Sequence, residues 1–357
     1  MSFLYGAVMK YYTTKPLVEY NTPTGEQIKK MEGTVYSMLE LPDGRLAVSY
    51  TIEYCDYLNY VESGVKVYDE KFARKYIFNG HESNILDLAL LPNDNIVSCG
   101  QDKTIRIWEL QNNHEIYKDV SKHEYFGIRD TTINIYAYQP YYKCTKILNG
   151  HISPVMALSV LPNGNIVSGS DNGRINIWDS DTGECTFTFS VGTERILSLG
   201  LLSDEKIVVQ TDDHVKIYTL NGECTNTIYV KYNECRMKVL ANDDIAVLLD
   251  DRTLGIYTKN NVGYYINSKI PGNISAFTVG ANGNIYIYTF SAVNNNYEIQ
   301  IYDDNTYQYV QTAGIYQNKI NGMTVMKDSS IITYQYISND KRKTTDTIIR
   351  RISTRKN

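Results

Sequence analysis

The chain has 357 residues, of which 43% are hydrophobic and 21% charged, and its formal net charge is -5 at pH 7. That hydrophobic content is enough for a sizeable core and excludes a globally disordered chain. The slightly acidic balance argues against a general binder of nucleic acid or of a membrane surface, because such proteins are usually basic.

The N-terminal sixteen residues, MSFLYGAVMKYYTTKP, contain no long apolar run, so we expect neither a signal peptide nor a membrane anchor. No later run reaches the roughly 18 apolar residues of a membrane span. The six cysteines form no CxxC pair, which removes support for a zinc or thioredoxin-like site. We predict a reducing, intracellular and cytoplasmic location, with Cys99, Cys185 and Cys224 acting as small core residues in strands.

A repeated pattern follows along the chain. Residues 80–109 read GHESNILDLALLPNDNIVSCGQDKTIRIWE, and residues 150–179 read GHISPVMALSVLPNGNIVSGSDNGRINIWD. Alternating apolar residues bounded by Pro, Asn, Asp and Gly predict short antiparallel strands joined by tight turns. Weaker copies occupy residues 35–70, 196–220, 237–259, 274–304 and 320–353. A period of roughly 40 residues is in the range of propeller blades.

The two clearest copies resemble the WD-repeat β-propeller family. The resemblance rests on Gly80-His81, Asp102 and Trp108 in one copy, and on Gly150-His151 and Trp178-Asp179 in the other. It implies an all-β fold in which four-stranded blades surround a central axis. It also implies that two sets of connections lie on one face, which we call the top face. These connections join the second strand of a blade to the third, and the outermost strand to the next blade.

The copies predict a single seven-bladed propeller over residues 33–357, preceded by an N-terminal segment, residues 1–32. The blades are expected at 33–78, 79–149, 150–191, 192–231, 232–271, 272–314 and 315–357. The second is about thirty residues too long, so residues 111–148 contain either an insertion or a truncated eighth blade. Residues 26–32, EQIKKME, resemble an outer strand, and we expect them to complete the last blade and close the ring.

The resemblance also implies a hydrogen-bonded chain of side chains within a blade. The matching residues are His81, Ser98, Asp102 and Trp108 in the second blade, and His151, Ser168 and Trp178 in the third. At the Asp position the third blade departs from the pattern, with Asn172 there and Asp171 beside it, and this departure is expected to weaken the network. A buried Trp needs a partner for its single N–H, and a satisfied polar network makes a blade rigid. Since the pattern recurs from blade to blade, whereas a catalytic site needs one convergent cluster, we interpret it as structural.

Function is therefore sought where the copies differ. Three connections between second and third strands are long: IEYCDYLNYVES, FSAVNNNYE and SNDKRKTTD, in the first, sixth and seventh blades, which are neighbours in a closed ring. Tyrosines beside charged residues suit a protein interface. The candidate partner-binding residues are Tyr54, Tyr57, Leu58, Tyr60, Tyr297, Lys341, Arg342 and Lys343. The 111–148 segment is aromatic and is a second candidate surface or a packed extra hairpin.

No phosphate-binding loop, zinc-protease motif or nucleophile elbow is present in the sequence. We predict no enzyme activity, no metal and no cofactor. The expected function is a protein interaction scaffold, monomeric within a complex, with other proteins as partners and no nucleic acid or membrane. One alternative is a ubiquitin-binding adaptor, because the phrase LPNDNIVSCGQDKTIRIW resembles propellers of the phospholipase-A2-activating type. Another is a propeller hydrolase acting at the central channel.

Overall fold

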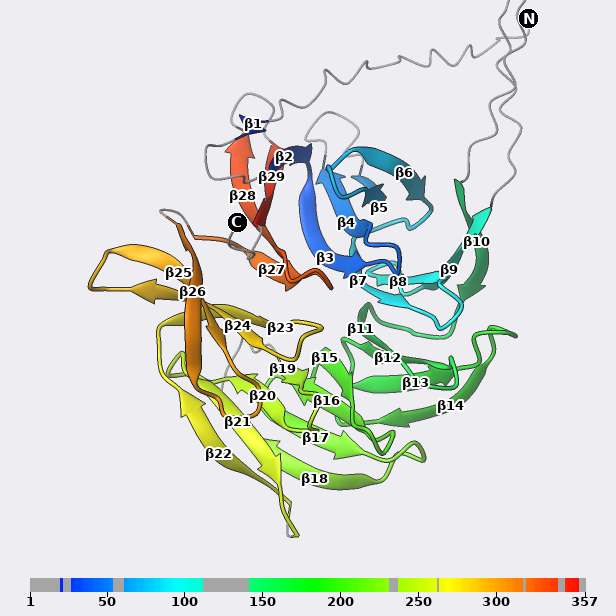
Figure 1. Ribbon diagram of the computed structural model, residues 1–357. Coiled ribbons are helices and arrows are strands. Elements are labelled where there is room, and N and C mark those ends of the chain that lie inside the picture. The colour runs from blue at the N-terminus through cyan, green and yellow to red at the C-terminus, as the bar shows by residue number, and fades with distance from the viewer. Residues whose placement is uncertain are drawn as a thin grey trace, which may run out of the picture.

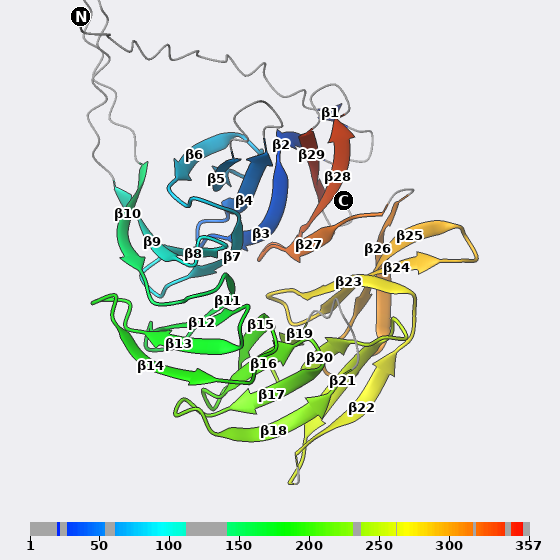
Figure 2. The same cartoon turned by 180° about the vertical axis from the view of Figure 1, so that it is seen from behind.

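The computed structural model describes residues 20–21, 27–53, 61–111, 141–230, 237–261, 263–316, 319–339 and 344–352. These residues form strands and no helices. The strands gather into seven antiparallel sheets. Figure 1 shows the sheets arranged around a ring in chain order, and Figure 2 shows the same ring from behind. The described residues therefore form an all-β ring of seven blades, as the sequence predicts.

We name the four strands of a blade a to d from the centre outward. Blade 1 contains β3 (Thr34–Glu40), β4 (Leu46–Glu53), β5 (Val61–Tyr68) and β6 (Arg74–Asn79). Blade 2 contains β7 (Ile85–Leu90), β8 (Ile96–Gly100), β9 (Ile105–Gln111) and β10 (Tyr141–Leu148). Blade 3 contains β11 (Val155–Val160), β12 (Ile166–Ser170), β13 (Arg174–Trp178) and β14 (Cys185–Ser190). Blade 4 contains β15 (Ile196–Leu201), β16 (Ile207–Thr211), β17 (His214–Tyr218) and β18 (Cys224–Tyr229).

Blade 5 contains β19 (Met237–Val239), β20 (Ile245–Leu248), β21 (Leu254–Lys259) and β22 (Tyr264–Ile270). Blade 6 contains β23 (Ile274–Val279), β24 (Ile285–Ser291), β25 (Asn296–Tyr302) and β26 (Tyr309–Tyr316). Blade 7 contains β27 (Gly322–Val325), β28 (Ile331–Asn339) and β29 (Thr344–Ile352) from the C-terminal part of the chain. Its outer strands are β2 (Gln27–Glu32) and the short β1 (Tyr20–Asn21).

The two ends of the chain meet in blade 7, which closes the ring. Strand β2 pairs antiparallel with β29, from Gln27 opposite Arg351 to Glu32 opposite Asp346. The Gly33 amide donates to the Thr345 carbonyl at 2.9 Å, where the chain passes from blade 7 into blade 1. The expected closing strand is confirmed. The additional strand β1 was not predicted, because two residues carry no periodic signal.

The predicted insertion begins where the described part of blade 2 is interrupted. Strand β9 ends at Gln111 and its outer neighbour β10 begins at Tyr141. Most of the predicted insertion, residues 112–140, lies outside the described residues. Whether this segment is an insertion or a truncated extra blade therefore stays a prediction.

The turn between strands a and b has the same backbone geometry in all seven blades. In each blade the residue whose amide donates to the carbonyl three positions earlier has a positive φ: Gly44, Asp94, Gly164, Glu205, Asp243, Gly283 and Ser329. The hydrogen bonds repeat as well, for example Asp94 N to Leu91 O at 3.0 Å and Ser329 N to Met326 O at 2.8 Å. Glycine adopts this left-handed conformation easily, whereas Glu205 and Ser329 adopt it at some cost. The turn geometry therefore identifies the weaker copies of the repeat, in which the residue types at this turn differ from blade to blade.

The core consists of seven apolar clusters, each between two adjacent blades. The cluster between blades 7 and 1 contains Met31 from β2, Val48 from β4 and Ile349 from β29. Each blade thus buries both faces against its neighbours, which is why β-branched residues crowd strands b and c. Opening one junction would expose two such faces.

The cysteine prediction is only partly correct. Cys99 is buried in β8, but Cys185 and Cys224 are exposed at the first positions of the outer strands β14 and β18. Outer strands have one solvated face, so membership of a strand does not by itself bury a residue. In the described part of the chain, no helix has the length and apolarity needed to cross a membrane.

Gln210 is an unusual core residue. It lies on β16 between Ser198 of β15 and Val215 of β17, it is fully buried, and neither atom of its amide has a hydrogen-bond partner. A buried amide without partners costs about 1–3 kcal/mol. Gln210→Met is therefore expected to raise the free energy of unfolding by about 1–2 kcal/mol in a urea titration, since it keeps a similar shape without the polar atoms.

Gln311→Met serves as the matched control, because Gln311 is exposed on the outer strand β26. This change is expected to alter stability by less than about 0.5 kcal/mol. A loss of stability in Gln210→Met would contradict the prediction and would indicate an internal water molecule bound to the amide.

Candidate functional site

The signature residues of blade 2 come from three adjoining elements. His81 lies in the connection before β7, Ser98 on β8, Asp102 in the turn between β8 and β9, and Trp108 on β9. Strands β8 and β9 pair with Ile96 opposite Trp108 and Ser98 opposite Arg106. This register brings the Trp108 ring under the connection that carries His81, so residues far apart in the sequence meet within one blade.

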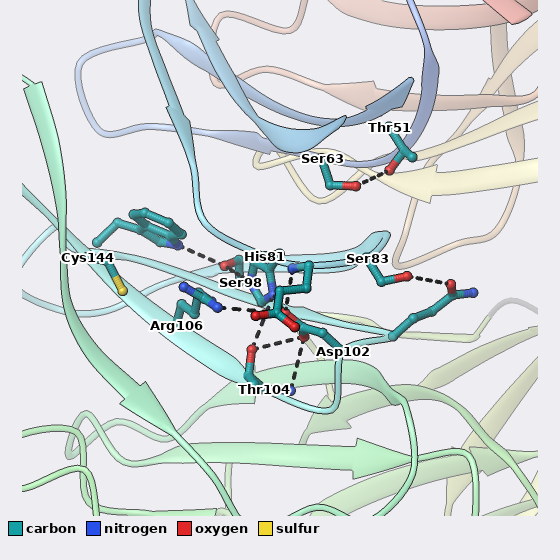
Figure 3. A network of polar contacts seen from close by, with 12 residues as sticks. Thr51, Ser63, His81, Ser83, Ser98, Asp102, Thr104, Arg106 and Cys144 are labelled. Atoms are coloured by element: carbon teal, nitrogen blue, oxygen red, sulfur yellow. Dashed lines mark hydrogen bonds and ion pairs between the residues drawn. The ribbon is translucent and has the colours of Figure 1, made fainter. Parts of the chain in front are cut away.

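These four side chains form a continuous hydrogen-bonded chain (Figure 3). Asp102 Oδ2 lies 2.8 Å from His81 Nδ1, and His81 Nε2 lies 2.7 Å from Ser98 Oγ. Trp108 Nε1 donates to the same Ser98 Oγ at 2.8 Å. Asp102 Oδ1 also accepts from the amide and hydroxyl of Thr104, at 3.1 and 2.9 Å. The network ties the top connection of the blade to its second and third strands.

The charge on Asp102 is well stabilised. Burial by itself raises its pKa, but the hydrogen bond and charge of His81, together with the amides of Thr104 and Glu82, outweigh burial and lower the pKa to about 2. Arg106 Nη2 lies 3.9 Å from the same carboxylate. Asp102 is therefore ionised at neutral pH, with four donors directed at its two oxygens.

An Asp–His–Ser chain of these distances also resembles the arrangement that activates a serine nucleophile. The surroundings of Ser98 argue against that use. Ser98 is 0% exposed, and its oxygen is already bonded to both His81 and Trp108. A nucleophile must have a reacting atom within about 3–3.5 Å, and no substrate can approach an oxygen enclosed in this way. This geometry favours a structural role for the network over a catalytic one.

Blade 3 has a shortened form of the network. His151 Nε2 lies 2.7 Å from Ser168 Oγ, and Trp178 Nε1 donates to Ser168 Oγ at 2.8 Å. Asn172 occupies the position of Asp102, but its Oδ1 accepts from Ser170 Oγ at 2.6 Å. His151 Nδ1 is buried with no hydrogen-bond partner. Burial, followed by the charge of Arg174, lowers the pKa of His151 to about 4.

Tyrosines occupy the Trp position in blades 1, 4, 5 and 6, whereas Ile352 lies there in blade 7. Tyr68, Tyr218, Tyr257 and Tyr302 each lie opposite the first apolar residue of strand b, as Trp108 does. All four are buried. A tyrosine packs an aromatic ring at the same position and has a hydroxyl in place of the indole N–H. The degenerate copies thus keep the packing role of the Trp residue without the full polar chain.

The three long connections form extended hairpins. In blades 2, 3 and 4 strand b has five residues and in blade 5 it has four. It has eight in blade 1, seven in blade 6 and nine in blade 7. The hairpins pair as far as Glu53 opposite Val61, Ser291 opposite Asn296, and Asn339 opposite Thr344.

These hairpins belong to consecutive blades. Shared apolar clusters join blade 6 to blade 7 and blade 7 to blade 1. Since all three connect strands b and c, and every blade has the same strand order from the centre outward, they extend from one face of the ring. We call the three hairpins the long-hairpin sector.

The structure locates few of the predicted partner-binding residues. Tyr54, Tyr57, Leu58, Tyr60, Lys341, Arg342 and Lys343 lie outside the described residues. Tyr297 is described and half-buried. Its ring stacks on Tyr288, with centroids 5.2 Å apart and planes 3° apart, and meets Phe290 edge-on at 5.1 Å. Tyr297 thus stiffens the blade 6 hairpin instead of projecting from it.

Sequence reasoning missed an exposed apolar residue of this sector. Val293, at the tip of the blade 6 hairpin, is 95% exposed. A single valine in the sequence AVNNN belongs to no apolar repeat, so periodicity does not reveal it. Its position in a long polar turn could have indicated an exposed apolar side chain. In the described ranges, no group of three or more His, Cys, Asp or Glu side chains is arranged to hold a metal ion.

Comparisons with known proteins agree with this architecture. The family model of the WD domain, G-beta repeat, matches residues 72–109 and 142–179, which contain the two signature networks' Trp residues. Ribosome biogenesis protein YTM1 of Saccharomyces cerevisiae is 30% identical over 109 residues, covering 30% of this chain and 22% of that protein. Pre-mRNA-processing factor 17 of the same yeast is 29% identical over 158 residues, covering 38% and 32%.

A broader match is the p21-activated protein kinase-interacting protein 1-like of Danio rerio, which is 25% identical over 206 residues, 53% of this chain and 55% of that protein. The match to the yeast YTM1 protein spans about a fifth of its length. Seven blades, two matched repeats and the His–Ser–Trp chains in both lead to one assignment. The chain is a seven-bladed β-propeller with WD repeats in blades 2 and 3, and it is similar to WD-repeat proteins.

Proposed function

We propose that this propeller is a non-catalytic scaffold that binds other proteins through its long-hairpin sector. The observation that carries the proposal is the lengthening of the b–c hairpins in blades 6, 7 and 1 alone among the seven blades. A ring of seven interlocked blades is rigid, and binding residues concentrate on connections that a rigid scaffold positions. An exposed valine at one tip and tyrosines in another give the sector apolar contact area.

The names of two relatives support the same class of function. One is a ribosome biogenesis protein and another a kinase-interacting protein, and neither name denotes an enzyme. Because fold alone does not determine function, the relatives indicate a class and no particular partner. We further propose that the protein acts as a monomer inside a larger complex, in the reducing interior of the cell. The four cysteines of the described residues are all free, which suits that compartment.

The alternative of a hydrolase at the central channel finds little support in the inner strands. Asp87, on β7, accepts hydrogen bonds from Ser37 Oγ at 3.1 Å, Leu88 N at 2.9 Å and Leu158 N at 3.0 Å. Burial raises its pKa, which those bonds partly offset. Its oxygens link blades 1, 2 and 3, so this carboxylate is engaged in holding inner strands together. Catalysis would need a free acid or base beside a substrate.

The scaffold proposal is tested by comparing co-purified proteins from cells that express the wild type, Val293→Asp or Tyr57→Asp/Tyr60→Asp. We expect the variants to lose a shared set of partners, because a buried carboxylate at an interface centre costs several kcal/mol. Val310→Asp is the matched control, since Val310 is exposed on the outer strand β26, away from the hairpins.

Partners retained by both hairpin variants but lost in Val310→Asp would contradict the proposed site. The narrower expectation that the partner is ubiquitin is tested by titrating purified ubiquitin against the same four proteins. Binding that the hairpin variants abolish and the control keeps would identify ubiquitin, whereas no binding to the wild type would exclude it.

A further inference from the structure

The networks of blades 2 and 3 differ at three positions that surround the histidine. Gly100, Asp102 and Thr104 in blade 2 correspond to Ser170, Asn172 and Arg174 in blade 3. The Ser170 hydroxyl binds Asn172 Oδ1 at 2.6 Å and Arg174 O at 3.1 Å. Asn172 is thereby engaged within its own turn, and an arginine replaces the threonine that bonds to Asp102. At the position of Asp102 blade 3 has no carboxylate, and at that of Thr104 it has a cation, although it keeps Asp171 in the same turn and has Asn176 in place of Arg106.

We propose that blade 3 is an acid-sensitive element of the ring, which loosens at its top connection, residues 149–154, when His151 is protonated, while blade 2 stays closed. The geometry carries this inference. His151 is buried, its Nε2 is bonded to Ser168, and its Nδ1 faces no acceptor. A proton on that ring places a charge and an unpaired N–H in the core, which is costly unless the ring moves to water.

The charged surroundings reinforce the effect. Ser168 on β12 and Trp178 on β13 supply the neutral contacts of the ring, and Asn172 in the turn between these strands is also uncharged. Arg174 on β13 is the ionised group whose charge acts on the ring, and it has the same sign as protonated His151. In blade 2 the equivalent histidine instead has the Asp102 carboxylate at 2.8 Å.

The direction of the pH effect follows from proton linkage. The pKa of His151 in the closed blade is about 4, below its ordinary value of 6.5. The open form therefore takes up the proton first as the pH falls, so acid favours opening. The closed state is destabilised as the pH falls from 6.5 to about 4, and its stability does not change with pH above 6.5 through this group. Between pH 7 and pH 5 the opening equilibrium is expected to rise about 20-fold.

Opening would change part of the top face. Ile152 follows His151 directly and is 68% exposed on the same connection. A loosened connection moves this side chain, so partner contacts at blade 3 would become weaker in acid while those at the long-hairpin sector would not. The inference rests on the propeller's own network and does not depend on the proposed partner site.

The test is hydrogen–deuterium exchange of the full chain at pH 7 and pH 5, corrected for intrinsic exchange rates. The Asp171 amide, which donates to the Pro154 carbonyl of the top connection at 2.9 Å, is expected to lose protection about 20-fold between the two values. Its blade 2 equivalent, the Gln101 amide bonded to the Asn84 carbonyl at 2.9 Å, should change by less than about threefold. Asn172→Asp restores a carboxylate beside His151 and is expected to remove most of the blade 3 response. Asn163→Asp, in the exposed turn of the same blade, adds the same charge away from the ring and should leave the response intact.

Equal loss of protection in blades 2 and 3, or a response that persists in Asn172→Asp, would overturn the proposal. If Asn172→Asp does not fold, His151→Gln replaces the titrating ring by a neutral amide. That variant is expected to show no difference in blade 3 protection between pH 7 and pH 5, and a difference as large as the wild type's would equally overturn it.

Discussion

Replacing Met31 with aspartate is expected to lower the free energy of unfolding by more than about 4 kcal/mol, enough to open the ring at neutral pH. Met31 is 1% exposed on the closing strand β2 and packs between blades 7 and 1. An ionised carboxylate there would lose its hydration, a cost that the Tyr68 hydroxyl, 4.0 Å from Met31 Sδ, would offset only in part, and it would separate β2 from the core. Blade 7 would then expose the edge of β29, and the prediction is checked by urea unfolding and by gel filtration for aggregation.

Lys30→Asp is the matched control, because Lys30 is the neighbouring residue on β2 and its side chain is exposed. The same carboxylate at this exposed position, where it changes the charge by two units instead of one, is expected to change stability by less than about 1 kcal/mol. Equal and small effects of the two substitutions would show that the N-terminal strand contributes little to closure, which would contradict the role assigned to β2.

Asp102→Asn is expected to lower the free energy of unfolding by about 2–4 kcal/mol at pH 7. Both oxygens of Asp102 accept hydrogen bonds, from His81, Glu82 and Thr104. An asparagine turns one acceptor into a donor that faces another donor. Since the network links the top connection to β8 and β9, the loss should spread through blade 2.

The pH dependence gives this prediction a second, independent readout. The folded pKa of Asp102 is about 2, below the ordinary value of 3.8, so its ionisation stabilises the fold above pH 3.8. That contribution, about 2 kcal/mol, disappears as the pH falls through the folded pKa. The stability difference between wild type and Asp102→Asn should therefore shrink between pH 4 and pH 2.

Asp94→Asn, in the exposed turn between β7 and β8, is the control, because asparagine adopts the left-handed conformation of Asp94 readily. It is expected to change stability by less than about 0.5 kcal/mol at either pH. A wild-type advantage over Asp102→Asn that is constant from pH 7 to pH 2 would contradict the electrostatic account of the network.

The amino-acid sequence by itself determined the repeat, and through it the fold. Alternating apolar residues and turn residues are local signals, and their recurrence in all seven copies outweighs the weakness of any one of them. Closure by residues 27–32 was also predictable, since an unpaired final blade needs an outer strand and the N-terminal segment contains one. The Trp and His residues of blades 2 and 3 were recognisable for the same reason.

Only the tertiary structure decided which polar partners each histidine has. Asp102 and Asn172 occupy equivalent positions, but the hydroxyl of Ser170 engages the Asn172 side chain and His151 Nδ1 has no partner, and sequence spacing contains no information about that competition. It likewise decided that Tyr297 stacks on Tyr288 while Val293 is exposed, and that Gln210 is buried without a partner. Periodicity encodes which face of a strand is turned inward, whereas hydrogen bonds and stacking depend on side chains that meet across strands and blades.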